Sequence, residues 1–197
     1  MGGSFNPAHD GHLHISRMAL SRLRLDAVWW LVSPGNPLKP RAGMAPFDAR
    51  LDFARRVTAR DPRIRVLDLE NRWKVRLTAK TLARMRQRFP QVDFVWLMGA
   101  DNLKQLPSWH RWREIVRGMP IAVFDRAPYS KGALAGRAAR RFARYRIPTK
   151  AAGILARQTP PSWVFLPIRR HSASATAIRA RGWDGFGCAL TNGEDNN

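Results

Sequence analysis

The chain has 197 residues, of which 45% are hydrophobic and eight are tryptophan; this composition argues against disorder and fits one domain with a sizeable core. Its 35 lysines and arginines outweigh 14 acidic residues, and the net charge of +21 favours polyanionic partners, although an arginine-rich proteome would give the same value without functional meaning. A single cysteine, Cys188, excludes an intrachain disulfide and argues against a cysteine-based zinc site, and no apolar run is long enough to span a membrane. We therefore expect a cytoplasmic protein.

Residues 2–12 combine a glycine pair, an Asn-Pro breaker and two histidines just before a helical pattern. A glycine-rich turn that opens a helix can cradle phosphate, because free backbone N–H groups and the positive end of the helix dipole point the same way. His9 and His12 would add side-chain donors. The alternative is a surface loop with two incidental histidines, and the coincidence of these features favours the phosphate cradle.

The hydrophobic pattern further along the chain predicts strands that alternate with helices. Apolar runs predict strands at 27–32, 94–98, 121–124 and 163–166, and the alternation of Ile64 and Val66 with arginines predicts another at 64–69. Helical spacing and capping predict helices at 11–24, 47–60, 78–88, 109–117, 132–146 and 172–181, with Thr78 as an N-cap. The alternation predicts an α/β domain over residues 1–182 with a parallel sheet, followed by a flexible tail over 183–197. Right-handed crossovers then bring the loops at 2–12, 33–40, 99–102 and 172–179 to one sheet edge.

The helix expected at 132–146 carries a basic stripe of Arg137, Arg140, Arg141 and Arg144. Such a stripe is usually a solvated helix face, and contact with nucleic acid is the alternative.

Two segments near opposite ends of the chain carry a family resemblance. Residues 2–12 resemble the N-terminal motif of the H-x-G-H nucleotidyltransferase superfamily, and Ser174-Ala175-Thr176-Ala177-Ile178-Arg179 resembles its second signature. Between them, residues 34–39, Thr78-x-x-Thr81-Leu82, residues 99–103 and Trp109 are similar, in the right order, to bacterial nicotinate-nucleotide adenylyltransferases. The resemblance implies a Rossmann-like, doubly wound parallel sheet of the nucleotidyltransferase type.

The resemblance also implies an activity, which is transfer of AMP from ATP to nicotinate mononucleotide to give deamido-NAD and pyrophosphate in NAD biosynthesis. ATP and nicotinate mononucleotide are then the expected partners, Mg²⁺ enters with ATP, and no metal site on the protein, membrane contact or specific nucleic acid is expected. Oligomeric state and the preference for nicotinate over nicotinamide nucleotide stay open.

The site residues follow from the matching motif positions. The expected catalytic residues are His9, His12 and Arg179. Contacts to ATP are expected from these three and from Gly3, Ser4, Phe5, Gly99, Asp101, Ser174 and Thr176. Contacts to nicotinate mononucleotide are expected from Asn6, Lys39, Arg50, Thr78 and Trp109. His14, His110 and His171 match no motif position and are expected to be bystanders.

The chain departs from the family pattern in two places. Family members begin with a strand before the glycine pair, whereas only Met1 precedes it here, so we expect a truncated first strand and a native protein that is longer at its N-terminus. Leu77 and Lys80 stand where the family usually has Tyr and Asp, which concerns the acceptor pocket more than the ATP site.

Two other functions compete with this interpretation. The same fold could transfer a nucleotide to another phosphate acceptor, such as phosphopantetheine. A non-catalytic basic protein could instead bind nucleic acid, with a steep dependence on salt and no turnover.

Overall fold

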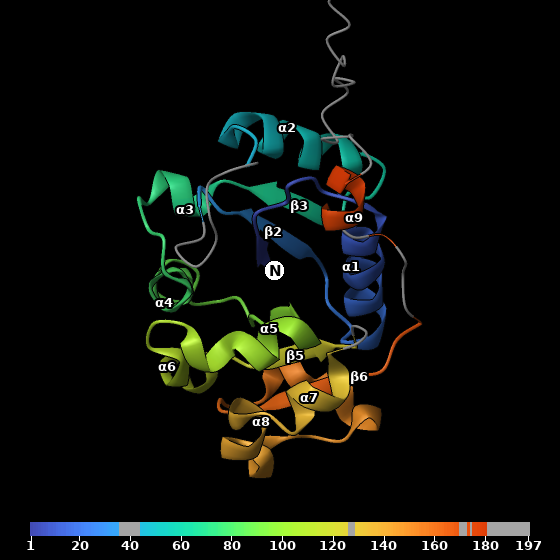
Figure 1. Ribbon diagram of the computed structural model, residues 1–197. Helices are drawn as coiled ribbons and strands as arrows, with labels where there is room; N and C mark the ends of the chain where they lie inside the picture. Colours follow the sequence, from blue (N-terminus) through green and yellow to red (C-terminus); the bar gives the residue numbers. More distant parts are fainter. Residues whose placement is uncertain (36–43, 126–128, 170–172, 174, 181–197) are drawn as a thin grey trace, which may run out of the picture.

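The computed structural model describes residues 1–35, 44–125, 129–169, 173 and 175–180, in which strands and helices alternate (Figure 1). The strands are β1 (Gly2–Gly3), β2 (Val28–Val32), β3 (Ile64–Leu67), β4 (Trp96–Gly99), β5 (Ile121–Phe124) and β6 (Trp163–Leu166). The α-helices are α1 (Asp10–Arg22), α2 (Phe47–Thr58), α3 (Leu69–Arg72), α4 (Thr78–Arg88), α5 (Ala100–Gln105), α6 (Trp112–Gly118), α7 (Ser130–Leu134), α8 (Arg137–Arg141) and α9 (Ala175–Ala180). Short 3₁₀ helices are η1 (Leu106–Ser108), η2 (Ala143–Tyr145) and η3 (Thr149–Arg157).

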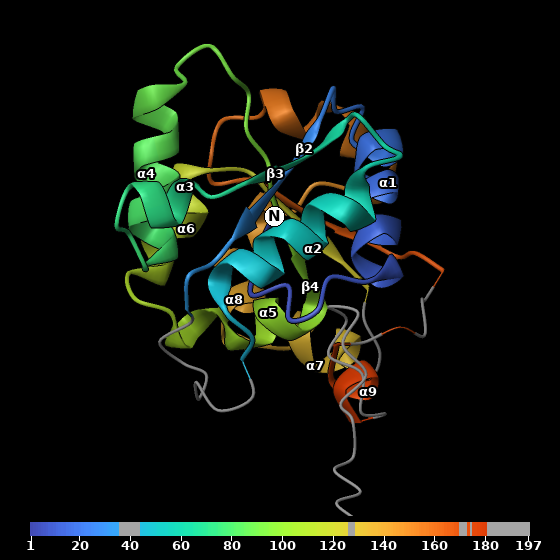
Figure 2. The same cartoon turned by 90° about the horizontal axis from the view of Figure 1, so that it is seen from above.

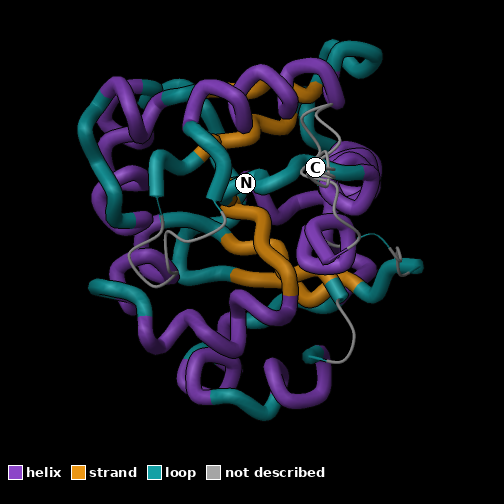
Figure 3. The backbone as a smooth tube through the Cα atoms, turned by 45° about the horizontal axis from the view of Figure 1, so that its top comes forward, coloured by secondary structure: helices purple, strands orange, loops and turns teal. Residues whose placement is uncertain are grey.

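The strands form two parallel sheets of three strands each, in the orders β1-β2-β3 and β4-β5-β6. The N-terminus lies between the two sets of strands in Figure 3, and a β-carbon placed on Gly2 would lie 2.7 Å from the ring of Trp96 at the start of β4. The two sheets therefore meet at Gly2. This arrangement confirms the predicted parallel α/β architecture.

The first strand is short, as the sequence predicts. Gly2 and Gly3 pair with Leu31 and Val32, and the Met1 carbonyl accepts a hydrogen bond of 2.9 Å from the Leu31 amide. The glycine pair is therefore itself the strand, and the loop that follows it starts at the carboxyl edge of the sheet.

Helices cover both faces of the strands. Along β2, Val28, Trp30 and Val32 pack into one core with residues of α1, α2 and η3. Leu31 points the other way, into a second core with residues of α4, α5, α6 and α8. Figure 2 shows α1 and α4 on opposite sides of the strands. Burial on both faces explains why the strands are continuous apolar runs, and it is the doubly wound arrangement implied by the resemblance.

Two predicted helices are wrong in extent. The helix expected at 132–146 is divided into α7, α8 and η2, because Gly136 is extended (φ −74°, ψ 165°) and a β-carbon there would lie 3.0 Å from the Ala133 carbonyl oxygen. The helix expected at 109–117 begins only at Trp112, because Arg111 before it has a left-handed φ of 53°.

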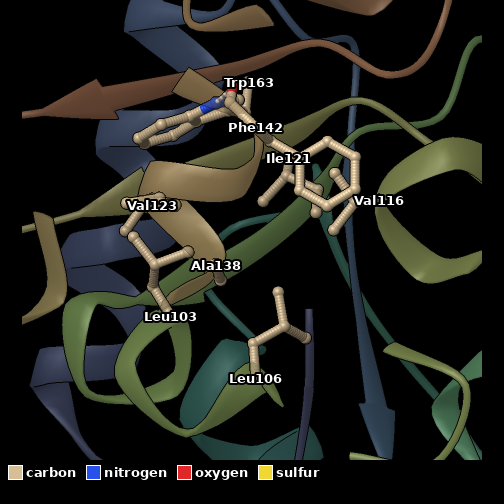
Figure 4. A pocket seen from close by; sticks show the side chains of 9 residues that line it. Leu103, Leu106, Val116, Ile121, Val123, Ala138, Phe142 and Trp163 are labelled. Atoms are coloured by element: carbon tan, nitrogen blue, oxygen red, sulfur yellow. Dashed lines mark hydrogen bonds between the residues drawn. The ribbon is translucent and has the colours of Figure 1, made fainter. Parts of the chain in front are cut away.

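The second core contains a small apolar cavity of about 10 Å³ (Figure 4). It is lined by Leu103, Leu106, Val116, Ile121, Val123, Ala138, Ala139, Phe142 and Trp163. With this apolar lining it offers water few hydrogen-bond partners, so we interpret it as a packing defect.

Candidate active site

The two histidines of the H-x-G-H motif cap the start of α1. The His9 Nδ1 atom accepts a hydrogen bond of 3.1 Å from the Gly11 amide, and the His12 Nδ1 atom accepts one of 3.2 Å from the His9 amide. A neutral imidazole that accepts at Nδ1 carries its hydrogen at Nε2, so the hydrogen bonds assign the donor atom of each ring. The ring centroids lie 3.9 Å apart. Two Nε2–H donors therefore sit together at the positive end of a helix, which suits an anion.

The glycine between these histidines is required by close packing. A β-carbon on Gly11 would lie 2.8 Å from His9 Cε1, 2.9 Å from His9 Nδ1 and 3.0 Å from the Ala173 carbonyl oxygen. Any larger residue would therefore push against the capping ring and against the start of the second signature.

The second signature reaches the N-terminal loop from the far end of the chain. The Arg179 Nη1 atom donates a hydrogen bond to the Asn6 carbonyl oxygen. Figure 1 shows α9, which carries Arg179, next to α1. Arg179 and Thr176 are exposed. The structure thus brings the three predicted catalytic residues to one region, while Ser174 lies outside the described residues.

A third contact ties the same two parts together, and it involves a residue that the sequence interpretation dismissed. The His14 Nε2 atom donates a hydrogen bond of 2.7 Å to the Arg169 carbonyl oxygen. The His14 side chain therefore joins α1 to the segment before α9, and the expectation that His14 has no role in the chemistry stays a prediction. His110 is exposed, and His171 lies outside the described residues.

The N-terminal loop itself is held by packing. Phe5 has a left-handed φ of 47°, which is unfavourable for a bulky residue, and its buried ring stacks on Trp30 with the centroids 4.8 Å apart. The neighbouring predicted ATP contacts, Gly3 and Ser4, are half-buried. This packing fixes the path of the loop between β1 and α1.

The carboxyl end of β4 supplies the next predicted ATP contacts. Gly99 ends the strand and precedes α5, and Asp101 lies in the first turn of that helix. Asp101 is half-buried. Gly2 of β1 lies against the Trp96 ring of β4, so we expect the turns after the two strands to open on the same side of the molecule.

The predicted acceptor contacts begin at α4. Thr78 is the first residue of the helix and not its N-cap, which is Leu77 without a side-chain cap. The prediction of Thr78 as the cap is therefore wrong by one residue. Trp109 is half-buried at the end of η1, whereas Trp112 is a buried core residue. Lys39 lies outside the described residues.

Two further acceptor candidates hold backbone segments together. The Asn6 Oδ1 atom accepts a hydrogen bond of 3.1 Å from the Ala45 amide. The buried Arg50 guanidinium donates to the carbonyl oxygens of Ala45 (3.0 Å), Ser4 (2.6 Å) and Ser33 (2.9 Å). Burial lowers the pKa of Arg50 below its ordinary value. Arg50 therefore connects α2 to the turns after β1 and β2, and its predicted contact with the acceptor stays a prediction.

A buried carboxylate lies behind this region, and the sequence patterns do not indicate it. The Glu70 Oε1 atom accepts a hydrogen bond of 3.0 Å from Thr81 Oγ1. Burial raises the pKa of Glu70, while hydrogen bonds from Thr81 and Ser33 and the charge of the Met1 amino group act in the opposite direction. Burial also lowers the pKa of that amino group to about 5. Glu70 thus links α4 to the loop after β2.

The described residues contain no group of three or more His, Cys, Asp or Glu side chains that could hold a metal ion. Within that part of the chain, no helix is long and apolar enough to cross a membrane.

Comparison with known proteins identifies the family. The family model "Cytidylyltransferase-like" matches residues 1–181. Curated relatives named "Probable nicotinate-nucleotide adenylyltransferase" include one from Parvibaculum lavamentivorans, 54% identical over 92% of this chain and 90% of its own length. Another, from Cereibacter sphaeroides, is 53% identical over 92% of this chain and 96% of its own length.

Solved structures show the same fold at low sequence identity. "Plasmodium falciparum nicotinic acid mononucleotide adenylyltransferase complexed with NaAD" has a TM-score of 0.67 and 16% identity, and the match covers 91% of this chain and 80% of that one. The same enzyme complexed with APC has a TM-score of 0.64, with 16% identity and the same coverage. The chain therefore belongs to the cytidylyltransferase-like family and, within it, to the nicotinate-nucleotide adenylyltransferases.

Proposed function

We propose that this chain transfers AMP from ATP to nicotinate mononucleotide, releasing pyrophosphate and deamido-NAD. The observation that carries the proposal is the contact between Arg179 and Asn6, which brings the second signature to the loop that leads into His9 and His12. Relatives that are more than half identical to the chain are named for the same acceptor, which supports the proposal.

The reaction itself requires little from the protein beyond placement and charge relief. An oxygen of the acceptor phosphate attacks the α-phosphorus of ATP in line, and the bond from that phosphorus to the bridging oxygen of pyrophosphate breaks. The acceptor phosphate has a second pKa of about 6, so it is mostly dianionic at neutral pH and needs no general base. The enzyme must hold two anions together and stabilise charge on the transferred and leaving groups.

The ATP side of the site can supply these groups. His9 and His12 would direct their Nε2–H donors at ATP phosphates, because their Nδ1 atoms are engaged by backbone amides. Arg179 offers a planar guanidinium to the β- and γ-phosphates. Ser174 and Thr176 would add hydroxyl donors, the loop of Gly3, Ser4 and Phe5 would follow the phosphates, and Gly99 and Asp101 would contact adenosine.

The acceptor side is proposed from the turn before α4 to Trp109. The first turn of α4 contains no acidic residue, so its amides can receive the nicotinate carboxylate beside Thr78. Trp109 would stack on the nicotinate ring, and Asn6, Lys39 and Arg50 would complete the acceptor contacts. Leu77 and Lys80, in place of the usual Tyr and Asp, border the same turn.

Mg²⁺ is expected to enter as part of the MgATP substrate, held by phosphate oxygens and water. The side chains that would meet the phosphates of this substrate are the histidine and arginine donors of the two signatures.

Acceptor profiling tests the proposal. Pyrophosphate release is measured with MgATP and, separately, nicotinate mononucleotide, nicotinamide mononucleotide and phosphopantetheine. We expect release with nicotinate mononucleotide, and its loss in a His12→Ala variant. Release with phosphopantetheine alone would support the sibling transferase instead. Absence of turnover together with tight, salt-dependent binding to DNA or RNA would support the nucleic-acid-binding alternative.

A further inference from the structure

A line of hydrogen bonds runs from the middle of the sheet into the helix that carries His12. The Trp30 Nε1–H group on β2 donates to Ser16 Oγ at 2.7 Å, and the Ser16 hydroxyl donates to the His12 carbonyl oxygen at 2.8 Å. Trp30 and Ser16 are both 0% exposed. A core tryptophan is thus connected to the backbone of a proposed catalytic residue through one serine.

The direction of this relay is fixed by the chemistry of its members. An indole N–H can only donate and a backbone carbonyl can only accept, whereas a serine hydroxyl has one hydrogen to give. Because Ser16 accepts from Trp30, its own hydrogen is directed to His12. Low dielectric surroundings strengthen such linked hydrogen bonds and make an unpaired member costly.

The same tryptophan also borders the imidazole of His12. Trp30 meets that ring edge-on with the centroids 5.8 Å apart, and Phe5, stacked on Trp30, lies 4.9 Å from it. The His12 Nδ1 atom is meanwhile held by the His9 amide. Backbone, ring faces and Nδ1 of His12 are therefore each fixed, which sets the direction of its Nε2–H bond.

We propose that Trp30 and Ser16 are positioning residues that hold His12 at the angle at which it meets the ATP phosphates. The proposal rests on the role proposed above for His12. Since a misplacement of 1 Å in a site can cost about 10²-fold in rate, loss of one member of the relay, with the ring packing kept, should lower kcat about 10-fold. The KM for nicotinate mononucleotide should stay within about twofold, because the relay does not contact the acceptor candidates Thr78 and Trp109.

Ser16→Ala, Trp30→Phe and the double variant test the relay by steady-state kinetics and thermal unfolding. Trp30→Phe keeps an aromatic ring next to Phe5 and removes the N–H donor together with part of the buried ring, whereas Ser16→Ala removes only a hydroxyl. Either single change breaks the relay, so the double variant should be no slower than the slower single variant.

Two matched controls separate positioning from stability. Trp29→Phe makes the same change one residue earlier, where the ring packs against Phe89 and Phe94. Thr58→Val removes a buried helical hydroxyl that donates to the Ala54 carbonyl at 3.1 Å, away from His12. Both controls should keep wild-type kcat even where their melting temperatures fall as far as those of the relay variants.

The relay is overturned if its variants keep kcat within about twofold of the controls, or if the double variant multiplies the two single effects. If His12→Ala is inactive while the Ser16 and Trp30 variants are unaffected, the positioning proposal fails and the proposed role of His12 stands. A fully active His12→Ala variant overturns the proposed role of His12 as well.

Discussion

Replacing Gly11 with alanine should remove activity while leaving the fold intact. The added methyl would lie 2.8 Å from His9 Cε1, a distance that side-chain β-carbons do not adopt, and 3.0 Å from the Ala173 carbonyl oxygen, which is tighter than nearly all such contacts. Gly11 lies in helix α1 without a left-handed φ, so alanine causes no backbone strain there and acts on the site through the collision alone. To relieve it, the His9 ring must leave its capping position or the segment at Ala173 must move away.

The change in stability should be small because two terms oppose each other. Alanine in place of glycine inside a helix stabilises by about 1 kcal/mol. Loss of the His9 cap costs about 1 kcal/mol. The rate, in contrast, depends on where the His9 Nε2–H donor points, and loss of one well-aimed donor costs about 10²–10³-fold. We therefore expect kcat to fall at least about 10²-fold with little change in melting temperature.

Pyrophosphate release from MgATP and nicotinate mononucleotide, together with thermal unfolding followed by circular dichroism, measures both quantities. Gly132→Ala in α7 is the matched control, since a β-carbon there would lie 4.0 Å from its nearest neighbour, the Lys104 Nζ atom. A Gly11→Ala enzyme with wild-type kcat would refute the packing argument. So would a loss of activity that merely follows a loss of folded protein.

Three other changes test the supporting structure. Arg50→Lys should destabilise the fold by about 2–4 kcal/mol in urea titrations, because an ammonium group cannot bond to the three carbonyls that Arg50 contacts at once. The control Arg55→Lys, at an exposed ion pair with Asp52, should be near neutral. Equal effects of the two changes would contradict the proposed structural role of Arg50. Glu70→Gln should raise the melting temperature at pH 8 and lose that advantage as pH falls towards 4.5: burial raises the folded pKa, so native Glu70 disfavours folding once pH exceeds the unfolded value. A gain that is independent of pH would contradict this sign. Val123→Ile should fill part of the apolar cavity and stabilise by up to about 1 kcal/mol without changing kcat, and destabilisation would show that the cavity cannot accept a methyl group.

The sequence predicts the strands well because their signal is local. Burial on both faces requires continuous apolar runs, and the runs at 121–124 and 163–166 match β5 and β6 exactly. Helix α4 ends at Arg88 as predicted, because its apolar residues repeat at helical spacing, although it begins one residue before the position that a Thr78 cap implies. The edge of the sheet that gathers the signatures follows from parallel topology alone, and the contact between Arg179 and Asn6 confirms that part of the prediction.

The remaining features depend on contacts between distant residues. His14, Ser16 and Glu70 have no distinctive local pattern, and their partners are 155, 14 and 11 residues away in the chain. The late start of the helix at Trp112 depends on the left-handed conformation of Arg111. Glycine and asparagine adopt this conformation most readily, so an arginine gives no sign of it in the sequence. The roles of such residues can be recognised only once the structure shows which partner each one contacts.

The dependence on distant partners also explains how this site is built. Strand β1 has two residues and α9 has six, and segments this short do not hold their shape alone. Each signature is therefore ordered by the other and by the core behind it, through Arg179 with Asn6, Gly11 against Ala173, and His14 with Arg169. Two of these contacts, Arg179 with Asn6 and His14 with Arg169, are polar contacts to backbone carbonyls and not part of the apolar cores, so we expect them to add little to global stability. A substitution that loosens them should lower the rate well before it lowers the melting temperature, which is why kcat and unfolding must be measured on the same variants.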